Sequence, residues 1–504
     1  MFRIKPWSLS SPTYNMLERL VSTGSGFPTV YVGDLALHSR YNPPAEAEKY
    51  INSLNFRGGV RFFILLEPGL GYAAEVLRKN FPHTVILNIH VSDFFSRPEI
   101  SSCGGAADGV WSPGSGETLL HFLENHLPDT EAAAVAIVEW RPSQAAFGEA
   151  YLKLFAEIVE YIKRIDANKR TVDNFGRRWF KNVFKNLRLL KKSLRYHPFL
   201  SPIVITGAGP SLEETIPILM EQKKYASLFI LAVSSSVPAL LSACLQPDLI
   251  LTTDGGNWAL LHLYEALRAK QRKVPAFAAA ITAALPSQFA ELPWLPISDG
   301  SLWQNLLLHS TGLPFAVLPQ RGTVTATALD LAFKLSQGPI YITGTDLGHR
   351  DIKTHARPYS FERLLTDKES HFNPVYSQTF MRASSIAAAG SHGIYTQWFA
   401  RQMASYPDRL FSIGNNSSVF TERSSRILSP VSGPVKDFVA ETAIPNEEPS
   451  TETISAALLH AMESDETRKV LMQELGPLLF PGSSTVSAEA IREEIYAASG
   501  VDHG

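Results

Sequence analysis

Apolar and polar residues alternate along the chain in a way that predicts two stretches of strands and helices. In the first stretch, apolar runs predict strands at 28–34, 59–66 and 83–91, and helical spacing predicts helices at 45–54 and 72–81. In the second stretch, from Pro202 to about Phe420, five further strands are predicted at 202–206, 228–234, 248–254, 276–282 and 339–345. Strands that alternate with helices form a parallel sheet with helices packed on it, so an α/β fold is expected.

Two helices are predicted between these stretches. The first, at 145–165, is amphipathic, and the second lies in the strongly basic segment 169–196. One face of the second helix is apolar, with Trp179, Val183, Leu187, Leu190 and Leu194 at helical spacing. The rest of its surface carries Arg177, Arg178, Lys181, Lys185, Arg188, Lys191 and Lys192. This pattern fits a solvated helix that joins two domains, and it also fits a basic face beside an anionic ligand or an acidic protein.

Changes in pattern and composition predict four regions. We expect a smaller α/β N-terminal domain at 1–130, a helical connection with the basic helix at 131–200, a Rossmann-like domain with a parallel sheet at 201–430, and a linker with a helical C-terminal region at 431–504. The linker is predicted from the Pro-rich stretch 430–451, and the Gly- and Ser-rich stretch 99–117 predicts a loop or flap.

Composition narrows the class of protein. A chain of 504 residues is too long for one hydrophobic core, so several domains are expected. The formal net charge of −2 gives no reason to expect a nucleic-acid partner. Cys103 and Cys244 are the two cysteines, which excludes a disulfide framework and a cysteine-based zinc site. The sequence has no apolar run long enough to span a membrane, so we expect a cytoplasmic protein without membrane insertion.

The stretch ITGAGPSLEET, at 205–215, predicts a strand, a tight turn and a helix in succession. Gly207 and Gly209 allow backbone angles and a close approach that a side chain would block. Ser211 is a good N-cap, and Glu214 three residues later completes a capping box. A helix N-terminus favours phosphate or carboxylate, so this turn is either a structural turn or an anion site. The turn at 69–71 allows the same two interpretations.

Three other predicted strands end in polar residues. Ser234 ends the strand at 228–234, and Thr253 and Asp254 end the strand at 248–254. The strand at 339–345 leads to Asp346 and then to the segment 353–355. Ligands of open α/β sheets gather at the carboxyl ends of the strands, so these residues are expected on one rim together with the glycine turn.

Five stretches of the chain resemble the motility accessory factor family of bacterial flagellin glycosyltransferases. They are NFGRRWFKNVFKNL, VITGAGPSL, QPDLILTTD, GTVTATALDLAFKL and PIYITGTDLGHRDIKTHA, in this order between about Thr171 and Gly414. That family shares its domain with archaeal 6-hydroxymethylpterin pyrophosphokinase-like proteins. The run Gly-Pro-Ser-Leu is also similar to that of bacterial sialyltransferases, which carry asparagine at the position of Ala208.

The resemblance implies a transferase that moves a nonulosonic sugar of the sialic, pseudaminic or legionaminic type. The donor would be the CMP-activated sugar and the acceptor a Ser or Thr hydroxyl of flagellin, with no cofactor required. His355 is our candidate for proton transfer because its ordinary pKa lies near the working pH. The catalytic candidates are His355, Asp346 and Asp254, and the nucleotide- or phosphate-binding candidates are Gly207, Ala208, Gly209, Pro210, Ser211, Leu212, Ser234, Thr253 and Lys353.

Two alternatives remain open from the sequence. In a pyrophosphokinase, Asp254 and Asp346 would hold Mg²⁺ between the phosphates of ATP, because hard oxygen ligands suit that ion. In a non-catalytic flagellar assembly factor, the fold would persist without the chemistry. The N-terminal domain and the helical tail favour the transferase, because they suit a protein that grips a large acceptor.

Overall fold

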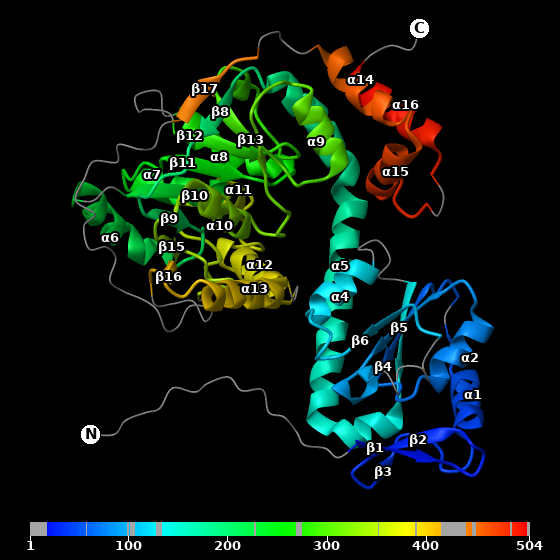
Figure 1. The fold of residues 1–504 in the computed structure, drawn as a ribbon. Coiled ribbons are helices and arrows are strands. Elements are labelled where there is room, and N and C mark those ends of the chain that lie inside the picture. The colour runs from blue at the N-terminus through cyan, green and yellow to red at the C-terminus, as the bar shows by residue number, and fades with distance from the viewer. Residues whose placement is uncertain are drawn as a thin grey trace, which may run out of the picture. The chain divides into compact units, whose positions relative to one another are not determined.

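The computed structural model describes residues 18–56, 58–97, 100, 106–127, 134–225, 228–268, 275–350, 352–388, 391–414, 440–445, 450–483 and 486–500. The chain divides into two compact units, Met1–Thr171 and Val172–Gly504, and the division falls within helix α5 (Arg141–Leu189) (Figure 1). Each unit has its own sheet and its own hydrophobic core.

The N-terminal unit is built on a parallel sheet of four strands. Its strand order is β6-β5-β4-β7, with β4 (Phe62–Leu66), β5 (Val85–Ile89), β6 (Gly109–Trp111) and β7 (Val135–Glu139). All five residues of β4 are buried, because this strand has a neighbour on both sides and helices over both faces. Helices α1 (Pro43–Ser53), α2 (Tyr72–Asn80) and α4 (Leu119–His126) and the first part of α5 complete the unit.

The strand predicted at 28–34 does not join this parallel sheet, which corrects part of the sequence prediction. It forms β2 (Pro28–Val32), which pairs antiparallel with β1 (Glu18–Ser22) and β3 (Leu35–Ala36) in a separate sheet. Val32 pairs with Leu35, so the two residues between them form a hairpin turn, and Gly33 there has a φ of 60°. A two-residue turn sends the next strand back antiparallel, whereas a parallel strand needs a long crossover.

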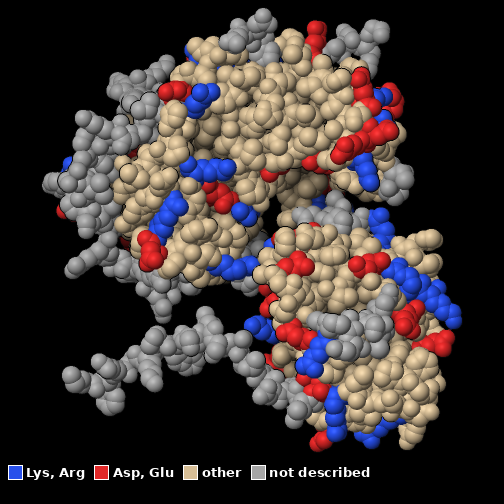
Figure 2. Space-filling model, viewed as in Figure 1, with Lys and Arg blue, Asp and Glu red and all other residues tan. Residues whose placement is uncertain are grey.

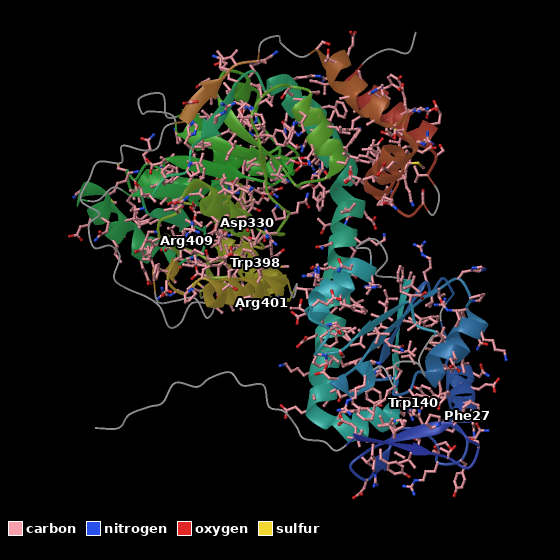
Figure 3. All side chains as sticks on the ribbon, in the orientation of Figure 1. Phe27, Trp140, Asp330, Trp398, Arg401 and Arg409 are labelled. Carbon is pink, nitrogen blue, oxygen red and sulfur yellow. The ribbon has the colours of Figure 1, made fainter. Side chains whose placement is uncertain are left out.

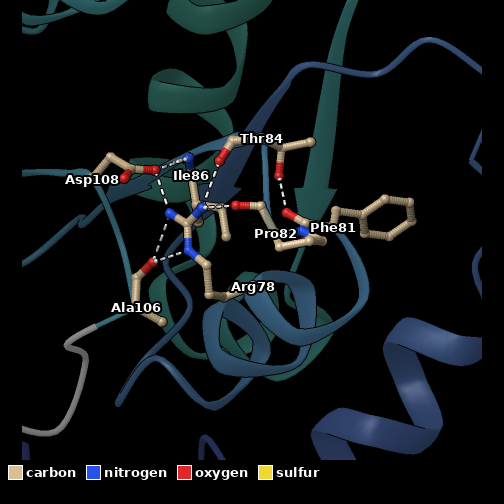
Figure 4. A network of polar contacts seen from close by, with 7 residues as sticks. All are labelled: Arg78, Phe81, Pro82, Thr84, Ile86, Ala106 and Asp108. Carbon is tan, nitrogen blue, oxygen red and sulfur yellow. Dashed lines mark hydrogen bonds and ion pairs between the residues drawn. The ribbon is translucent and has the colours of Figure 1, made fainter.

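Arg78, near the end of α2, forms hydrogen bonds with the segment before β5 and with the segment before β6 (Figure 4). Its guanidinium donates to the backbone oxygens of Pro82, Thr84 and Ala106 and pairs with the carboxylate of Asp108. The same Asp108 oxygen accepts from the amide of Ile86 at 2.8 Å. Because the guanidinium's partners include three carbonyl groups, we assign Arg78 a structural role.

The second unit is built on a ten-stranded sheet. Its order is β16-β15-β9-β10-β11-β12-β13-β8-β17, with β14 beside β13. All its strand pairs are parallel except β17 with β8. The strands are β8 (Ser193–Tyr196), β9 (Ile203–Thr206), β10 (Phe229–Val233), β11 (Leu249–Thr252), β12 (Ala276–Ala280), β13 (Trp294–Ser298), β14 (Ala316–Val317), β15 (Ile340–Thr343), β16 (Leu410–Ser412) and β17 (Ala440–Ala443). The five strands predicted in this region are confirmed.

Helices cover both faces of this sheet, which confirms the expected Rossmann-like α/β architecture. One face packs on the end of α5 and on α6 (Leu212–Tyr225), α7 (Val237–Ser242), α8 (Leu260–Arg268) and α9 (Leu302–His309). The other face packs on α10 (Val324–Leu335) and α13 (Ser391–Ser405). On that second face lie Asp330 of α10 and Trp398 of α13 (Figure 3). The Arg321 guanidinium is 5.3 Å from the ring centre of Trp398 and binds the carboxylate of Asp330.

The C-terminal region is helical, as expected. Helices α14 (Thr451–Ala461), α15 (Asp465–Leu479) and α16 (Ala488–Ser499) pack on one another and against α9. A short helix, α11 (Glu362–Thr366), and a longer one, α12 (Val375–Ala388), follow β15. The predicted loop at 99–117 and the Pro-rich stretch 430–451 fall partly outside the described residues.

On the face that Figure 2 shows, both basic and acidic residues are present on each unit, and uncharged residues cover much of the second unit. This agrees with the nearly balanced composition of 46 basic and 48 acidic residues. Of the helices within the described residues, none has the length and apolar content that a membrane span requires.

Candidate functional site

The carboxyl ends of the central strands bring the predicted site residues to one edge of the sheet. The register pairs Thr343 of β15 with Thr206 of β9, and Thr206 with Ala232 of β10. The chain runs outward from β9 through β10 to β13, and then returns to place β15 on the other side of β9. The strand order therefore reverses between β9 and β15, and such a reversal is where open α/β sheets bind their ligands.

The glycine turn after β9 packs directly on the turn after β15. The amide of Gly207 donates to the carbonyl of Thr343 at 2.7 Å, and the amide of Gly209 donates to the carbonyl of Gly344 at 2.7 Å. A Cβ on Gly207 would lie 2.3 Å from the carbonyl oxygen of Gly344, and one on Gly209 would lie 2.0 Å from Asp346 Oδ2. The glycines are therefore required for the close approach of two backbones, since neither has a positive φ.

The N-terminus of α6 already holds an anion, which is the carboxylate of Asp346. Asp346 Oδ2 accepts from the Ser211 amide at 3.0 Å and from the Ser211 hydroxyl at 2.9 Å. The Ser211 hydroxyl thus serves this contact, where the sequence had suggested a local capping box with Glu214. The amide of Leu212 donates to the carbonyl of Gly209, and Pro210 has no amide hydrogen. A phosphate would have to displace Asp346 to reach the donors of this turn.

Burial raises the pKa of Asp346 above its ordinary value of 3.8. The two hydrogen bonds from Ser211 and the charge of Arg350 act in the opposite direction, while the negative charge of Glu214 adds to the rise. The folded protein therefore holds this proton to a higher pH than the unfolded chain does, so ionisation of Asp346 lowers stability.

The pH dependence of stability should report this shift. Because the pKa of Asp346 is raised in the folded protein, protonated Asp346 contributes to the free energy of unfolding. This contribution is fully present below about pH 3.8 and is lost as the pH rises through the pKa of Asp346 in the folded protein. The D346N variant has no carboxylate to ionise at this position, so it should not show this loss. Its free energy of unfolding, relative to that of the wild type, should therefore increase between about pH 4 and neutral pH. Urea unfolding at a series of pH values measures the difference. D254N, at an exposed carboxylate, is the control, and a pH-independent difference for D346N would contradict the prediction.

The segment after Asp346 is tied to the first turn of α6. Lys353 Nζ lies 2.9 Å from Glu213 Oε2, and Arg350 pairs with Glu214. The amide of Ala356 donates to the carbonyl of Ala208 at 2.8 Å. Burial alone would raise the pKa of Glu213, but the hydrogen bonds from Lys353 and the Arg357 amide, with the charges of both residues, lower it. Lys353 therefore contacts a carboxylate in this structure, and its predicted contact with a phosphate stays a prediction.

His355 lies in this same segment, one residue before the contact with Ala208. Its Nδ1 is 3.0 Å from Thr354 Oγ1, and its ring stacks on Tyr359 with 4.1 Å between ring centres and 18° between planes. The imidazole is half-buried and its orientation is fixed by these two contacts. An imidazole held in one orientation beside the glycine turn can take or give a proton there.

Asp254 and Asp346 lie on the same edge but not together. They follow β11 and β15, which are separated by β9 and β10, so about 14 Å lies between the strand positions. Asp254 is exposed and accepts from the amide of Gly256 at 2.7 Å. Thr253, half-buried, precedes it, and buried Ser234 begins the short 3-10 helix after β10. Among the described residues, no group of three or more His, Cys, Asp and Glu side chains is placed to hold a metal ion.

The basic segment of α5 contacts the loops that follow two strands of this edge. The sequence analysis named Trp179 and Lys185 on this helix, but it did not predict their contacts with these loops, and it did not single out Asn182. Asn182 Nδ2 donates to the carbonyls of Gly255 and Thr282, and Lys185 donates to the carbonyl of Leu285. A Cβ on Gly255 would lie 2.4 Å from the indole of Trp179. These contacts fix the loops after β11 and β12, so this part of the helix has a structural role. The polar residues on its otherwise apolar face were the available signal.

Asn186 allows this support to be tested. Its side chain is fully buried, and its Nδ2 donates to the carbonyls of Ile281 and Ala283 at 2.8 and 2.7 Å. We expect Asn186→Leu to lower the free energy of unfolding by about 2–4 kcal/mol, because two buried carbonyls lose their donor. Urea unfolding measures this loss. Lys181→Ala, at an exposed position of the same helix, should change it by less than about 0.5 kcal/mol. Equal effects of the two substitutions would contradict the assignment.

The N-terminal glycine turn, at 69–71, is also occupied by a side chain of the protein itself. The amide of Leu70 donates to Nε2 of His38 at 2.9 Å, and a Cβ on Gly69 would lie 2.3 Å from the same nitrogen. Burial lowers the pKa of His38 to about 3, so the imidazole is neutral and can accept this bond. The turn at 69–71 therefore has a structural role in this unit.

Part of the second unit matches a known protein family. Residues 177–351 match the family model of 6-hydroxymethylpterin diphosphokinase MptE-like proteins. An uncharacterized protein of Treponema pallidum (strain Nichols) is 28% identical over 286 residues, which are 56% of this chain and 60% of that protein. A second uncharacterized protein of the same strain is 27% identical over 43% of this chain and 80% of its own length.

One solved structure matches nearly the whole chain. It is the structure of MAf glycosyltransferase from Magnetospirillum magneticum AMB-1, with a TM-score of 0.50 and 14% sequence identity over 96% of this chain and 86% of that one. Residues 177–351 therefore match an MptE-like family model, and the chain shares the fold of the MAf glycosyltransferase structure. The resemblance to the motility accessory factor family is thus supported at the level of the fold, together with the MptE-like match over residues 177–351.

Proposed function

We propose that the protein is a glycosyltransferase that moves a nonulosonic sugar from a CMP-activated donor to a Ser or Thr hydroxyl of flagellin. The observation that carries the proposal is the extent of the structural match. The MptE-like domain accounts for residues 177–351, whereas the MAf glycosyltransferase fold covers 96% of the chain. The match to the MAf glycosyltransferase structure therefore includes the N-terminal unit and the C-terminal helices. A kinase that acts on a small molecule has no evident use for these two parts.

The rim of the second unit supplies groups that suit this reaction. In the proposed step, the acceptor oxygen forms a bond to the anomeric carbon while the bond from that carbon to the phosphate oxygen breaks, and CMP leaves with the electron pair. His355 accepts the proton of the acceptor hydroxyl. Lys353 breaks its ion pair with Glu213 when the donor binds, and its ammonium group then stabilises the charge of the leaving phosphate. Asp254, which is exposed, accepts hydrogen bonds from ribose or sugar hydroxyls.

The diphosphokinase named by the family model is the second candidate. It would use ATP with Mg²⁺, held by Asp254 and Asp346. Against it stands the placement of these carboxylates on strands separated by β9 and β10, because a single ion accepts ligands at about 2.0–2.1 Å and cannot bridge that gap.

Binding measurements separate the two candidates. We expect isothermal titration calorimetry to show binding of CMP without a metal requirement, and no comparable binding of ATP with Mg²⁺. Binding of ATP and Mg²⁺ without any response to CMP would exclude the transferase. A strain that lacks this protein tests the acceptor, because its flagellin should lose mass equal to the attached sugars.

A further inference from the structure

A row of rings connects the loop of Asp254 to His355. Trp258 lies in the short 3-10 helix Asn257–Ala259 that follows Asp254, and its side chain is 65% exposed. Its indole meets Phe361 edge-on, with 6.5 Å between ring centres. Phe361 in turn contacts Tyr359 at 5.0 Å, and Tyr359 stacks on His355 at 4.1 Å. Two parts of the rim that are far apart in the sequence are thus joined by aromatic contacts.

The rings are held in place by buried groups beneath them. His262, which is buried, lies 5.0 Å from Phe361 and 5.8 Å from Tyr359, and its Nδ1 is 2.8 Å from Ser360 Oγ. On the other side, the loop that carries Trp258 is fixed through Gly255, which packs on Trp179. An exposed tryptophan on a fixed loop offers a flat apolar surface to a ligand without the entropic cost of ordering a mobile side chain.

We propose that Trp258 is the stacking surface for the nucleobase of the nucleotide-sugar donor, an assignment that rests on the proposed function. The loop that carries Trp258 follows β11, and the glycine turn follows β9, so two strand spacings, about 10 Å, separate these places. A nucleotide spans a similar distance between its phosphate and its base. A base stacks on an indole over its whole ring, and exposed Asp254 lies on the same loop to accept hydrogen bonds from the ribose.

Isothermal titration of the full chain with cytidine, with CMP and with N-acetylneuraminic acid tests the assignment. We expect Trp258→Ala to weaken the binding of cytidine and of CMP about 5- to 100-fold. Trp258→Phe should restore most of the affinity because it retains a ring. Tyr41→Ala, at an aromatic residue that is 82% exposed in the N-terminal unit, should leave both affinities unchanged. Thermal unfolding of each variant should match the wild type, because Trp258 is not part of the core.

The outcomes separate this inference from the proposed function. If wild-type protein binds CMP and Trp258→Ala binds it equally well, the stacking surface is wrong and the transferase proposal stands. If Trp258→Ala weakens the binding of N-acetylneuraminic acid but not of cytidine, the indole contacts the sugar, and the assignment to the base is wrong. If wild-type protein binds neither CMP nor cytidine, the proposed function fails together with this assignment.

Discussion

Gly207→Ala should lower the free energy of unfolding by about 3 kcal/mol, the upper end of what overpacking usually costs. The new Cβ would lie 2.3 Å from the carbonyl oxygen of Gly344 and 2.8 Å from its carbonyl carbon. These atoms belong to the backbone, so the contact cannot be relieved by a change of rotamer. The two turns would have to separate, which would strain the hydrogen bonds from Gly207 to Thr343 and from Gly209 to Gly344.

The matched control for this substitution is Gly348→Ala, in the segment that follows β15. A Cβ at Gly348 would have ordinary contact with the nearest atom, the carbonyl oxygen of Asp346 at 3.7 Å, and this glycine has no positive φ. Urea unfolding followed by circular dichroism should separate the two variants. A Gly207→Ala protein within about 0.5 kcal/mol of the wild type would show that the turns are not closely packed.

Five of the ten strands of the second unit could be predicted because they are nearly uninterrupted apolar runs. Such runs are typical of parallel strands that are buried on both faces. Strand β13 was missed since it contains Pro296, which usually argues against a strand inside a sheet. Strands β8 and β17 were missed because they are short and carry polar residues, which is typical of strands near a sheet edge.

The site itself was predicted only as a set of residues on one rim. The sequence indicated that Asp346 and the glycine turn would end neighbouring strands, but local rules assigned the cap of α6 to Ser211 and Glu214. The carboxylate that binds this helix terminus comes from 135 residues further along the chain. His38 similarly fills the N-terminal turn from 32 residues away. The Asp346 contact depends on the order of β9 and β15 in one sheet, whereas the His38 contact joins segments that follow strands of two separate sheets. No local pattern encodes either arrangement.

The glycine turns at 69–71 and 207–209 have the same arrangement. Each follows a buried strand and precedes a helix, and in each the free amide donors are satisfied by a side chain of the protein. The difference lies in what that side chain can do. His38 is neutral and almost fully buried, so it is a permanent partner. Asp346 is partly accessible and burial raises its pKa, so in the proposed function it is the partner that a phosphate would have to displace.

His355→Ala should reduce sugar transfer by about 10²- to 10⁴-fold, the range expected when a positioned acid–base group is removed. The contacts of His355 with Thr354 and Tyr359 fix the ring beside the turn where Ala356 binds Ala208. In the proposed reaction, removal of the imidazole leaves the acceptor hydroxyl without a proton acceptor, whereas the neighbouring contacts of the segment remain. Donor binding should therefore change little, and the loss should fall on the rate of transfer.

Intact-mass analysis of flagellin that is co-expressed with each variant measures this effect. His349→Ala is the matched control, because His349 lies in the same segment after β15 and is exposed. Flagellin that is co-expressed with His349→Ala should carry the full sugar mass, whereas flagellin that is co-expressed with His355→Ala should be unmodified. Titration with CMP then distinguishes two causes of a loss. Unchanged CMP affinity with lost transfer supports proton transfer by His355, whereas lost affinity would make it a binding residue. Full glycosylation by His355→Ala would exclude it from the mechanism and leave Asp346 and Asp254 as the remaining candidates for the base.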